Sequence, residues 1–292
     1  MDYTLAIGDR TYSSWSLRGW LLFARFGLPV QVVSARLYTP GFAQMLEGFA
    51  PARLVPVMRG PEGTVWDSLA MAETLAEAFP DAGHWPRDRR ARAMARSLAA
   101  EMHSGFTALR AACPMNLAEA VSGFVPDGGV LADLSRLETL WAAAGAATGR
   151  SEGEWLFGDY SVADAFFAPV AARVATYGLP VTPEARAYVD RYLADGAFRR
   201  WRAMGRAADP VQERYGTGLP ERPWPGPVPL PAEAVTGETP LNETCPYSGK
   251  PVVPEALARI DGQVIGFCNT FCRDKTVADP EAWPEAMQLL GR

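Results

Sequence analysis

The fold of the chain is decided by a short stretch near its N-terminus, Tyr12-Ser13-Ser14-Trp15-Ser16. The preceding residues 3–7 alternate in the way that is typical of a strand. After the stretch, apolar side chains recur at helical spacing, which predicts an amphipathic helix that ends before Gly27 and Pro29; they are Leu17, Trp20, Leu21 and Ala24. A strand expected over residues 31–37 makes this a right-handed βαβ unit, because parallel strands need a crossover connection.

A second set of elements follows within the first 82 residues. Two strands are expected over residues 56–59 and 64–66, because the turn-forming run Gly60-Pro61-Glu62-Gly63 lies between them. A helix is expected from Ser68 to the residue before Pro80. The order βαβ and then ββα predicts an α/β thioredoxin-like domain over residues 1–82.

The chain then changes character. No strand pattern occurs from Asp88 to about residue 208, and apolar stripes at helical spacing predict an all-α domain over residues 87–210. Residues 216–243 contain seven prolines and no periodicity, which predicts a Pro-rich linker. Residues 244–292 form a separate short module, too small to be stable by burial alone unless it docks on the body or is cross-linked.

Bulk composition points to a small-molecule partner. The net charge is −5 and neither sign forms a long run, so neither nucleic acid nor a membrane surface is expected as a partner. No segment approaches the roughly 20 apolar residues of a membrane span. The first residues do not have the pattern of a secretory signal, so we expect a cytoplasmic protein.

The three serines at the start of the first helix predict a site for a thiol compound. Lowering a thiol pKa from about 8.5 to about 6.5 takes roughly 2.7 kcal/mol of preferential thiolate stabilisation. A hydroxyl donor at a helix N-terminus, where backbone N–H groups and the helix dipole also favour an anion, supplies this chemistry. Ser13, Ser14 and Ser16 are candidates; the alternative is that they only cap the helix.

Two further motifs complete this predicted pocket. A proline placed directly before a strand, as in Val55-Pro56, can be cis and can expose the preceding backbone for pairing with a bound peptide. Asp67-Ser68 opens the next helix, where a hydroxyl and free N–H groups can bind a carboxylate and Asp67 can bind an ammonium group. The alternatives are an ordinary trans proline and a simple helix cap.

Four segments together carry a family resemblance. The segments are Tyr12-Ser13-Ser14-Trp15-Ser16-Leu17-Arg18, Leu54-Val55-Pro56-Val57, Asp67-Ser68-Leu69-Ala70-Met71-Ala72-Glu73 and Phe157-Gly158-Asp159-Tyr160-Ser161-Val162-Ala163-Asp164. With them the sequence resembles the cytosolic glutathione transferases, nearest to their serine-dependent, zeta-like bacterial branch. The resemblance covers residue 3 to about residue 210. The last segment looks like that superfamily's capping box and hydrophobic staple.

The resemblance implies a glutathione-binding thioredoxin-like domain, a helical domain that supplies the electrophile pocket, and a homodimer. By matching positions, Ser13 stabilises the thiolate, with Ser14 as the alternative. Val55 pairs through its backbone before a cis Pro56, and Asp67 with Ser68 binds the γ-glutamyl end. Trp15 stands where the zeta class carries cysteine, and Asp67 where glutamate is commoner, which argues against zeta-type isomerase or dehalogenase activity.

Large apolar side chains are candidate liners of the second-substrate pocket, since methionine and aromatic residues suit adaptable surfaces; they are Trp15, Met102, His103, Phe106 and Met115. The alternative is that most of them belong to the core of the helical domain. A lone helical histidine is usually structural, so we assign His103 no role.

The C-terminal module contains three of the four cysteines. Cys245, Cys268 and Cys272 follow a spacing that resembles TRASH/YHS-type modules, which are associated with heavy-metal handling. Thiolates are soft ligands, so zinc or another soft metal is expected, and metal binding would explain how so short a module stays folded. No fourth ligand is evident. The alternatives are redox-labile or merely structural cysteines.

Two functions therefore remain open. The first is a glutathione transferase, acting in detoxification, that activates the glutathione thiolate for conjugation to, or reduction of, a small hydrophobic electrophile. The second is a metal-binding sensor or trafficking protein that uses a transferase-like scaffold without catalysis.

Overall fold

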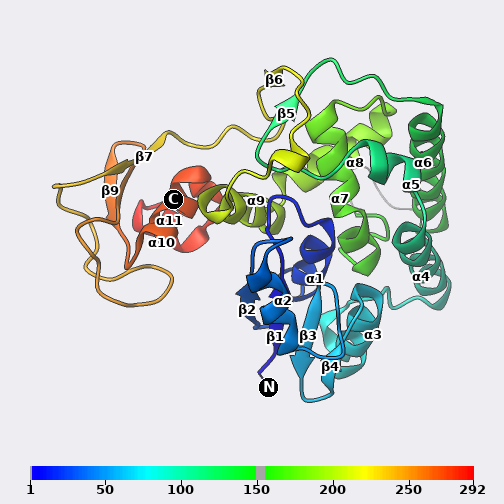
Figure 1. The fold of residues 1–292 in the computed structure, drawn as a ribbon, viewed down its shortest axis with the longest axis horizontal. Helices are drawn as coiled ribbons and strands as arrows, with labels where there is room; N and C mark the ends of the chain where they lie inside the picture. Colours follow the sequence, from blue (N-terminus) through cyan, green and yellow to red (C-terminus); the bar gives the residue numbers. More distant parts are fainter. Residues whose placement is uncertain (1, 149–154) are drawn as a thin grey trace. The chain divides into compact units, whose positions relative to one another are not determined.

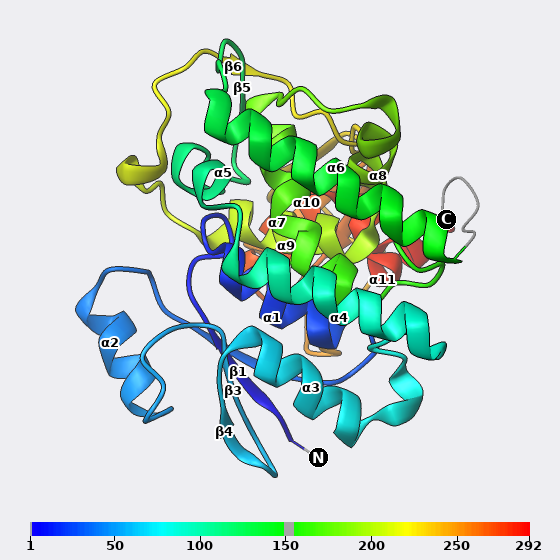
Figure 2. The same ribbon diagram turned by 90° about the vertical axis from the view of Figure 1, so that its right-hand side faces the viewer.

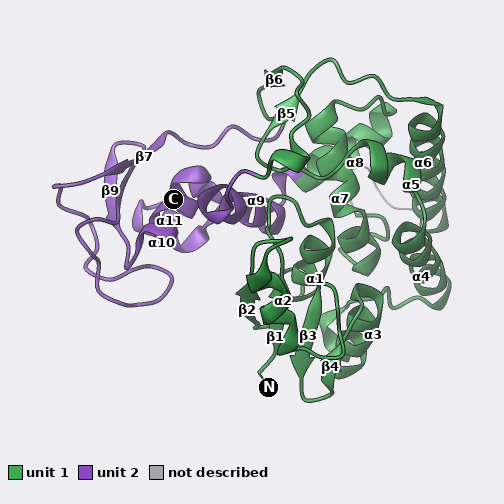
Figure 3. Cartoon of the chain, in the orientation of Figure 1, with its two compact units in different colours: residues 1–192, 212–225 green, residues 193–211, 226–292 purple. Residues whose placement is uncertain are grey.

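The computed structural model describes residues 2–148 and 155–292. Met1 and residues 149–154, which fall inside the two predicted domains, lie outside the described residues. Two compact units make up the chain (Figure 3): unit 1 holds residues 1–192 and 212–225, and unit 2 holds residues 193–211 and 226–292. These units are defined by contacts, whereas the domain boundaries expected from the sequence stay predictions.

Unit 1 begins with a four-stranded mixed sheet (Figure 1). Its strands are β1 (Thr4–Ile7), β2 (Gln31–Ser34), β3 (Val57–Gly60) and β4 (Gly63–Val65), in the order β2-β1-β3-β4. Strand β1 is parallel to β2 and antiparallel to β3, and β3 is antiparallel to β4. The predicted thioredoxin-like order of elements is confirmed.

Helices cover both faces of this sheet. Helix α1 (Ser14–Ala24) packs against β1 and against α3 (Ser68–Ala78), and Figure 2 shows these two helices beside each other. On the other face Ala6 and Val57 form a buried cluster with Leu46 of α2 (Pro40–Glu47). Helix α2 was not predicted, because its first two residues, Pro40 and Gly41, are also typical of a loop.

One glycine sets the distance between α1 and the loop before β3. A Cβ atom added at Gly19 would lie 2.5 Å from Cβ of Pro56, closer than real side chains approach each other. Gly19 therefore allows the helix that begins at the serine stretch to pack directly on Pro56.

The rest of unit 1 is mainly helical, as predicted. Its helices are α4 (Arg89–Ser104), α5 (Thr107–Ala112), α6 (Gly128–Thr148), α7 (Val162–Tyr177) and α8 (Pro183–Ala194), with the short 3-10 helices η1 (Pro80–Ala82) and η2 (Glu213–Tyr215). Every residue of α7 is buried, and it packs against α1 and α4. A two-stranded sheet, β5 (Ala120–Val121) with β6 (Glu221–Arg222), was not predicted, because its partners lie about a hundred residues apart.

The predicted capping box at the start of α7 is confirmed. Oδ2 of Asp164 accepts hydrogen bonds from the backbone N–H of Ser161, at 2.9 Å, and from its hydroxyl, at 3.0 Å. Oδ1 accepts from the Tyr188 hydroxyl at 2.7 Å and from the backbone N–H of Leu156 at 3.1 Å. Four donors thus satisfy this fully buried carboxylate, which joins the start of α7 to the loop before it and to α8.

Unit 2 combines one long helix with the cysteine module. Helix α9 (Gly196–Ala208) packs on α10 (Thr270–Ala278), and the module continues into η3 (Pro280–Ala282) and α11 (Pro284–Leu289). Its antiparallel sheet is β7 (Ala232–Val235), β8 (Leu257–Ile260) and β9 (Gln263–Gly266). Strand β7 lies in the segment expected to be a linker. The module is thus stabilised by packing on α9 and by the edge strand β7, which belongs to the proline-rich segment.

Among the described residues, none of the helices is both long enough and apolar enough to span a membrane.

Candidate functional site

The loop before α1 is held by two of its three serines. Ser13 is the N-cap of α1: its Oγ accepts a hydrogen bond from the backbone N–H of Ser16 at 3.2 Å and donates to Oγ of Ser16 at 2.7 Å. Oγ of Ser16 also accepts from the backbone N–H of Gly8 at 3.0 Å. Ser13 is 7% exposed and Ser16 is fully buried, so both hydroxyls serve the turn from β1 into the helix.

Ser14 differs from these two. It is the first residue of α1 and is partly exposed, and no hydrogen bond to its hydroxyl exists within the described residues. A ligand can therefore reach the Ser14 hydroxyl without breaking a bond of the fold, whereas Ser13 would have to give up its contact with Ser16.

The peptide bond between Val55 and Pro56 is cis, as the family resemblance implies. Throughout residues 2–148 and 155–292, no hydrogen bond engages the backbone N–H or C=O of Val55. These two groups just precede β3 and offer the strand-like pairing that a bound peptide requires.

The start of α3 forms the other side of the predicted peptide site. Asp67 caps the helix, with Oδ1 accepting from the backbone N–H of Leu69 at 3.0 Å. The Ser68 side chain is fully buried, and its Oγ has no partner among the described atoms. Buried hydroxyls are nearly always hydrogen-bonded, so an unpaired one at a helix N-terminus is the kind of group that a ligand carboxylate completes.

His103, to which sequence reasoning gave no role, contacts this site. Its Nε2 lies 2.9 Å from Oδ2 of Asp67, and its ring meets the Trp15 ring edge-on at a centroid distance of 5.1 Å. The side chain of His103 is 23% exposed and that of Asp67 is 52% exposed. The helical part of unit 1 thus reaches the start of α3 through one histidine.

Cationic side chains also surround Trp15, and the sequence analysis missed them. The guanidinium carbons of Arg18 and Arg110 lie 4.5 Å and 5.1 Å from the Trp15 ring centroid. Arg18 is 2% exposed and donates from Nε to the carbonyl of Phe166 at 3.1 Å. Burial, together with the charges of Arg110 and Arg173, lowers the pKa of Arg18 well below its usual value.

The other predicted liners lie deeper. Met102, Phe106 and Met115 are buried at 0%, 6% and 1% exposure, as members of a helical core would be. Of the five candidate liners, Trp15 and His103 are those with appreciable exposed surface.

The three C-terminal cysteines come together in unit 2. The Sγ atoms of Cys245, Cys268 and Cys272 all lie within 4.8 Å of one another. Burial raises the pKa of Cys245, but hydrogen bonds from the backbone N–H groups of Cys268, Tyr247 and Ser248 and from the Ser248 hydroxyl outweigh it and bring the pKa to about 7. Burial and the neighbouring Cys245 raise the pKa of Cys272 to about 12.

A cation lies close to this cluster. The Lys275 ammonium sits 3.6 Å from the ring centroids of both Tyr247 and Trp283. Burial lowers its pKa to about 8, while the nearby Cys272 and Cys245 act in the opposite direction. Cys113 is fully buried in unit 1 and is not part of the cluster; burial raises its pKa to about 11.

Comparison with known proteins identifies the fold. Residues 12–78 match the family model described as glutathione S-transferase, N-terminal domain. A solved glutathione transferase homolog from Burkholderia, with bound glutathione, is 26% identical with a TM-score of 0.53, over 72% of this chain and 100% of that one. The chain has the glutathione S-transferase fold. The family model and the Burkholderia structure support placing it in the glutathione S-transferase superfamily.

More distant structures share this fold alone. A glutathione transferase from Methylococcus capsulatus is 21% identical with a TM-score of 0.52, over 70% of this chain and 98% of that one. A glutathione S-transferase from Rhodospirillum rubrum is 19% identical with a TM-score of 0.52, over 75% and 96%. No sequence among curated proteins matches the chain. The serine-type, zeta-like branch and the TRASH-like module stay predictions.

Proposed function

We propose that the protein is a glutathione transferase that ionises the glutathione thiol and directs it at a small electrophile. The observation that carries the proposal is the buried, unpaired Ser68 hydroxyl at the N-terminus of α3, in the segment that matches the glutathione S-transferase model. The Burkholderia homolog with bound glutathione has the same fold and adds support. Conjugation and thiol-dependent reduction both fit this site.

We assign the roles as the family resemblance implies, and the contacts described above support them. Ser68, with the N–H groups of α3, binds the γ-glutamyl carboxylate, and Asp67 binds the ammonium group. The backbone of Val55, before the cis Pro56, pairs with the cysteinyl part of the tripeptide. A hydroxyl at the start of α1 donates to the sulfur and stabilises the thiolate. Ser13 was the first candidate from sequence, but its engagement with Ser16 favours Ser14.

Two alanine variants test the hydroxyl. We expect Ser14→Ala to lower kcat/KM for glutathione-dependent conjugation at neutral pH by about tenfold or more, since one charge-assisted hydrogen bond contributes roughly 1.5–3 kcal/mol. The pH at which turnover reaches half its plateau should rise in this variant. Ser13→Ala serves as the matched comparison at the neighbouring position. The proposal would be refuted if the protein did not bind glutathione at millimolar concentration. It would also be refuted if both variants were as active as the wild type.

The peptide site has its own test. Ser68→Ala removes the unpaired hydroxyl without opening space, so we expect weaker binding of glutathione and unchanged or improved stability, because a buried unsatisfied group is lost. Isothermal titration calorimetry with glutathione measures the affinity, and urea unfolding measures the stability. Unaltered affinity in Ser68→Ala would remove the main support for a glutathione site at α3.

A second function is favoured by the cysteine cluster. Three thiols within 4.8 Å suit a soft ion such as zinc or copper(I), and the charge of the nearby Lys275 favours the thiolate form of Cys272. Cys245, Cys268 and Cys272 would hold the ion, which would cross-link the beginning of the module to the start of α10. We propose that unit 2 binds one such ion, as a sensor or trafficking protein would.

Elemental analysis of protein purified without chelator tests the metal site. We expect one soft ion per chain in the wild type and in Cys113→Ser, and loss of the ion in Cys245→Ser. Folded, metal-free wild-type protein that takes up no zinc or copper(I) on titration would exclude the site.

The transferase proposal also includes a homodimer, a cytoplasmic location and a role in detoxification. Gel filtration with light scattering measures whether the protein is a homodimer.

A further inference from the structure

The chain after α9 returns to the loop that begins α1. Within unit 1, Gln212 is 8% exposed and donates from its backbone N–H to the Tyr12 hydroxyl at 3.2 Å and from Nε2 to Oδ2 of Asp9 at 2.6 Å. The Tyr215 ring stacks on the Tyr12 ring with centroids 4.7 Å apart. A segment 200 residues away in sequence therefore packs directly on the residues before Ser13.

Asp9 is hydrogen-bonded to three segments of unit 1: the segment that contains Gln212, the loop after β2 and the start of α1. Its Oδ2 also accepts a hydrogen bond from the backbone N–H of Leu37, in the loop after β2, at 2.9 Å. Its carbonyl accepts from the backbone N–H of Ser13 at 2.9 Å. Asp9 is 5% exposed, so water cannot replace a lost donor. Gln212 thus bonds to the side chain of the same residue whose backbone carbonyl sets the start of α1.

We propose that Gln212 is a positioning residue for thiol activation. It holds the Asp9 side chain, and through the Asp9 backbone it fixes Ser13 and the first turn of α1 in the orientation from which a hydroxyl and the helix N-terminus face the sulfur. This inference rests on the proposed transferase function for its consequence in catalysis. Gln212 lies between the helical domain expected over residues 87–210 and the linker expected over residues 216–243, so neither the pattern nor the motifs pointed to it.

The test compares the same new side chain at two adjacent positions. Gln212→Met keeps the length of the side chain and removes its donor, and Glu213→Met is the control at an exposed neighbour. We expect Gln212→Met to lower kcat/KM at neutral pH by about tenfold and to move the pH profile of turnover upward by about one unit, with less than about a twofold change in KM for glutathione. Glu213→Met should behave as the wild type.

Hydrogen exchange of the Ser13 amide gives a readout that does not depend on catalysis. Because this N–H donates to the carbonyl of Asp9, we expect it to exchange at least about tenfold faster in Gln212→Met than in the wild type or Glu213→Met. Equal exchange in all three proteins overturns the inference. Faster exchange with an unchanged pH profile overturns the role in thiol activation. If Gln212→Met does not fold, Gln212→Asn, which keeps the amide but cannot reach Asp9, is measured in the same way.

A wild-type protein without glutathione-dependent turnover refutes the proposed function and with it the catalytic role. The positioning of Ser13 by Gln212 is then decided by hydrogen exchange alone, so the two failures are distinguishable.

Discussion

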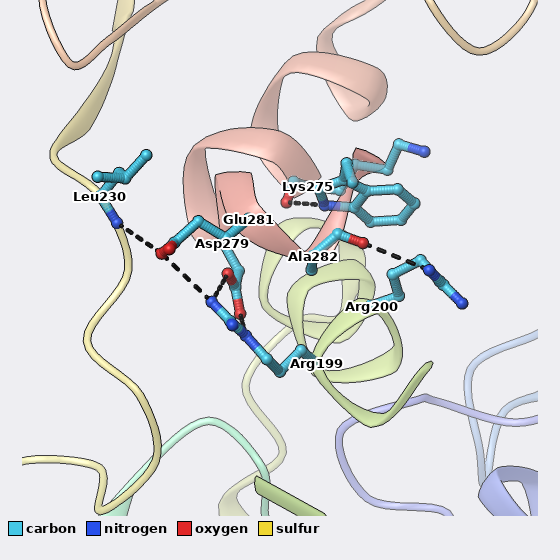
Figure 4. A network of polar contacts seen from close by, with 8 residues as sticks. Arg199, Arg200, Leu230, Lys275, Asp279, Glu281 and Ala282 are labelled. Atoms are coloured by element: carbon cyan, nitrogen blue, oxygen red, sulfur yellow. Dashed lines mark hydrogen bonds and ion pairs between the residues drawn. The ribbon is translucent and has the colours of Figure 1, made fainter. Parts of the chain in front are cut away.

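Arg199 of α9 holds both carboxylate oxygens of Asp279, at the end of α10, with Nε at 2.8 Å from Oδ2 and Nη2 at 2.6 Å from Oδ1 (Figure 4). The two side chains are only 15% and 9% exposed. Glu281 adds an oxygen 3.5 Å from the same guanidinium and accepts from the backbone N–H of Leu230 at 3.2 Å. One arginine thus connects α9, the end of α10 and the proline-rich segment.

This pair should decide the stability of unit 2. We expect Arg199→Met to lower the free energy of unfolding by about 3 kcal/mol, because it leaves a nearly buried carboxylate without its partner. Arg259→Met is the control: Arg259 pairs with Glu233 and Glu238 in the same unit, but its side chain is 37% exposed, so the loss should be under about 1 kcal/mol. Urea unfolding followed by tryptophan fluorescence measures both, and similar losses in the two variants would contradict the prediction.

His84 should make the stability of unit 1 fall in mild acid. Its ring is 2% exposed and donates from Nε2 to the carbonyl of Leu22 at 3.0 Å, while its buried Nδ1 has no partner among the described atoms. Burial lowers the pKa of His84 below its usual 6.5, although the bond to Leu22 acts in the opposite direction. The folded protein therefore takes up this proton less readily than the unfolded chain.

The sign of the effect follows from that difference. Above the unfolded value of 6.5 the ring is neutral in both states and stability is complete. As the pH falls below 6.5, the unfolded chain is protonated first, and the free energy of unfolding drops by up to about 1.4 kcal/mol per pH unit until the folded pKa is reached. His84→Gln should reduce this dependence in urea unfolding at pH values of about 7.5 and about 5.5. The same slope in the variant and the wild type would count against His84 as the cause.

The thioredoxin-like half was predictable because its signals are local. Strand β1 is a short, mostly apolar run that is buried from Leu5 to Ile7, and α1 begins at a serine N-cap and shows its apolar stripe within one segment. Helix α2 was missed because Pro40 is compatible both with a loop and with the first position of a helix, and only Thr39 as a cap separates the two cases.

The part of the candidate glutathione site that could be predicted from the sequence consists of residues at the N-termini of helices. Asp67 and Ser68 carry the pattern of a capping pair, and so does a pair with no function, which is why sequence alone left both interpretations open. Arg18 bonds to a carbonyl 148 residues away and Gln212 to a carboxylate 203 residues away, so no window of sequence contains these contacts. Packing alone brings them to the site.

Gly19 should be intolerant of alanine although it lies inside a helix. Alanine is ordinarily about 1 kcal/mol more favourable than glycine there. Its Cβ would however lie 2.5 Å from Cβ of Pro56, so α1 or the loop must move, and we expect a net loss of about 1–3 kcal/mol. Gly128→Ala, at the first position of α6, where no atom lies within 4 Å of the added Cβ, should be neutral or slightly stabilising. A stabilised Gly19→Ala protein in urea unfolding would refute the close packing.

Metal binding should stabilise unit 2 through the three thiols. An ion that binds only the folded module adds about 2.7 kcal/mol when its free concentration is one hundred times the Kd. Zinc titrated into the wild type and into Cys113→Ser should therefore raise the midpoint of thermal unfolding, and chelator should reverse the rise. Cys245→Ser should lose the response, because Cys245 belongs to the three-thiol cluster. An equal shift in Cys245→Ser would mean that zinc binds elsewhere on the chain.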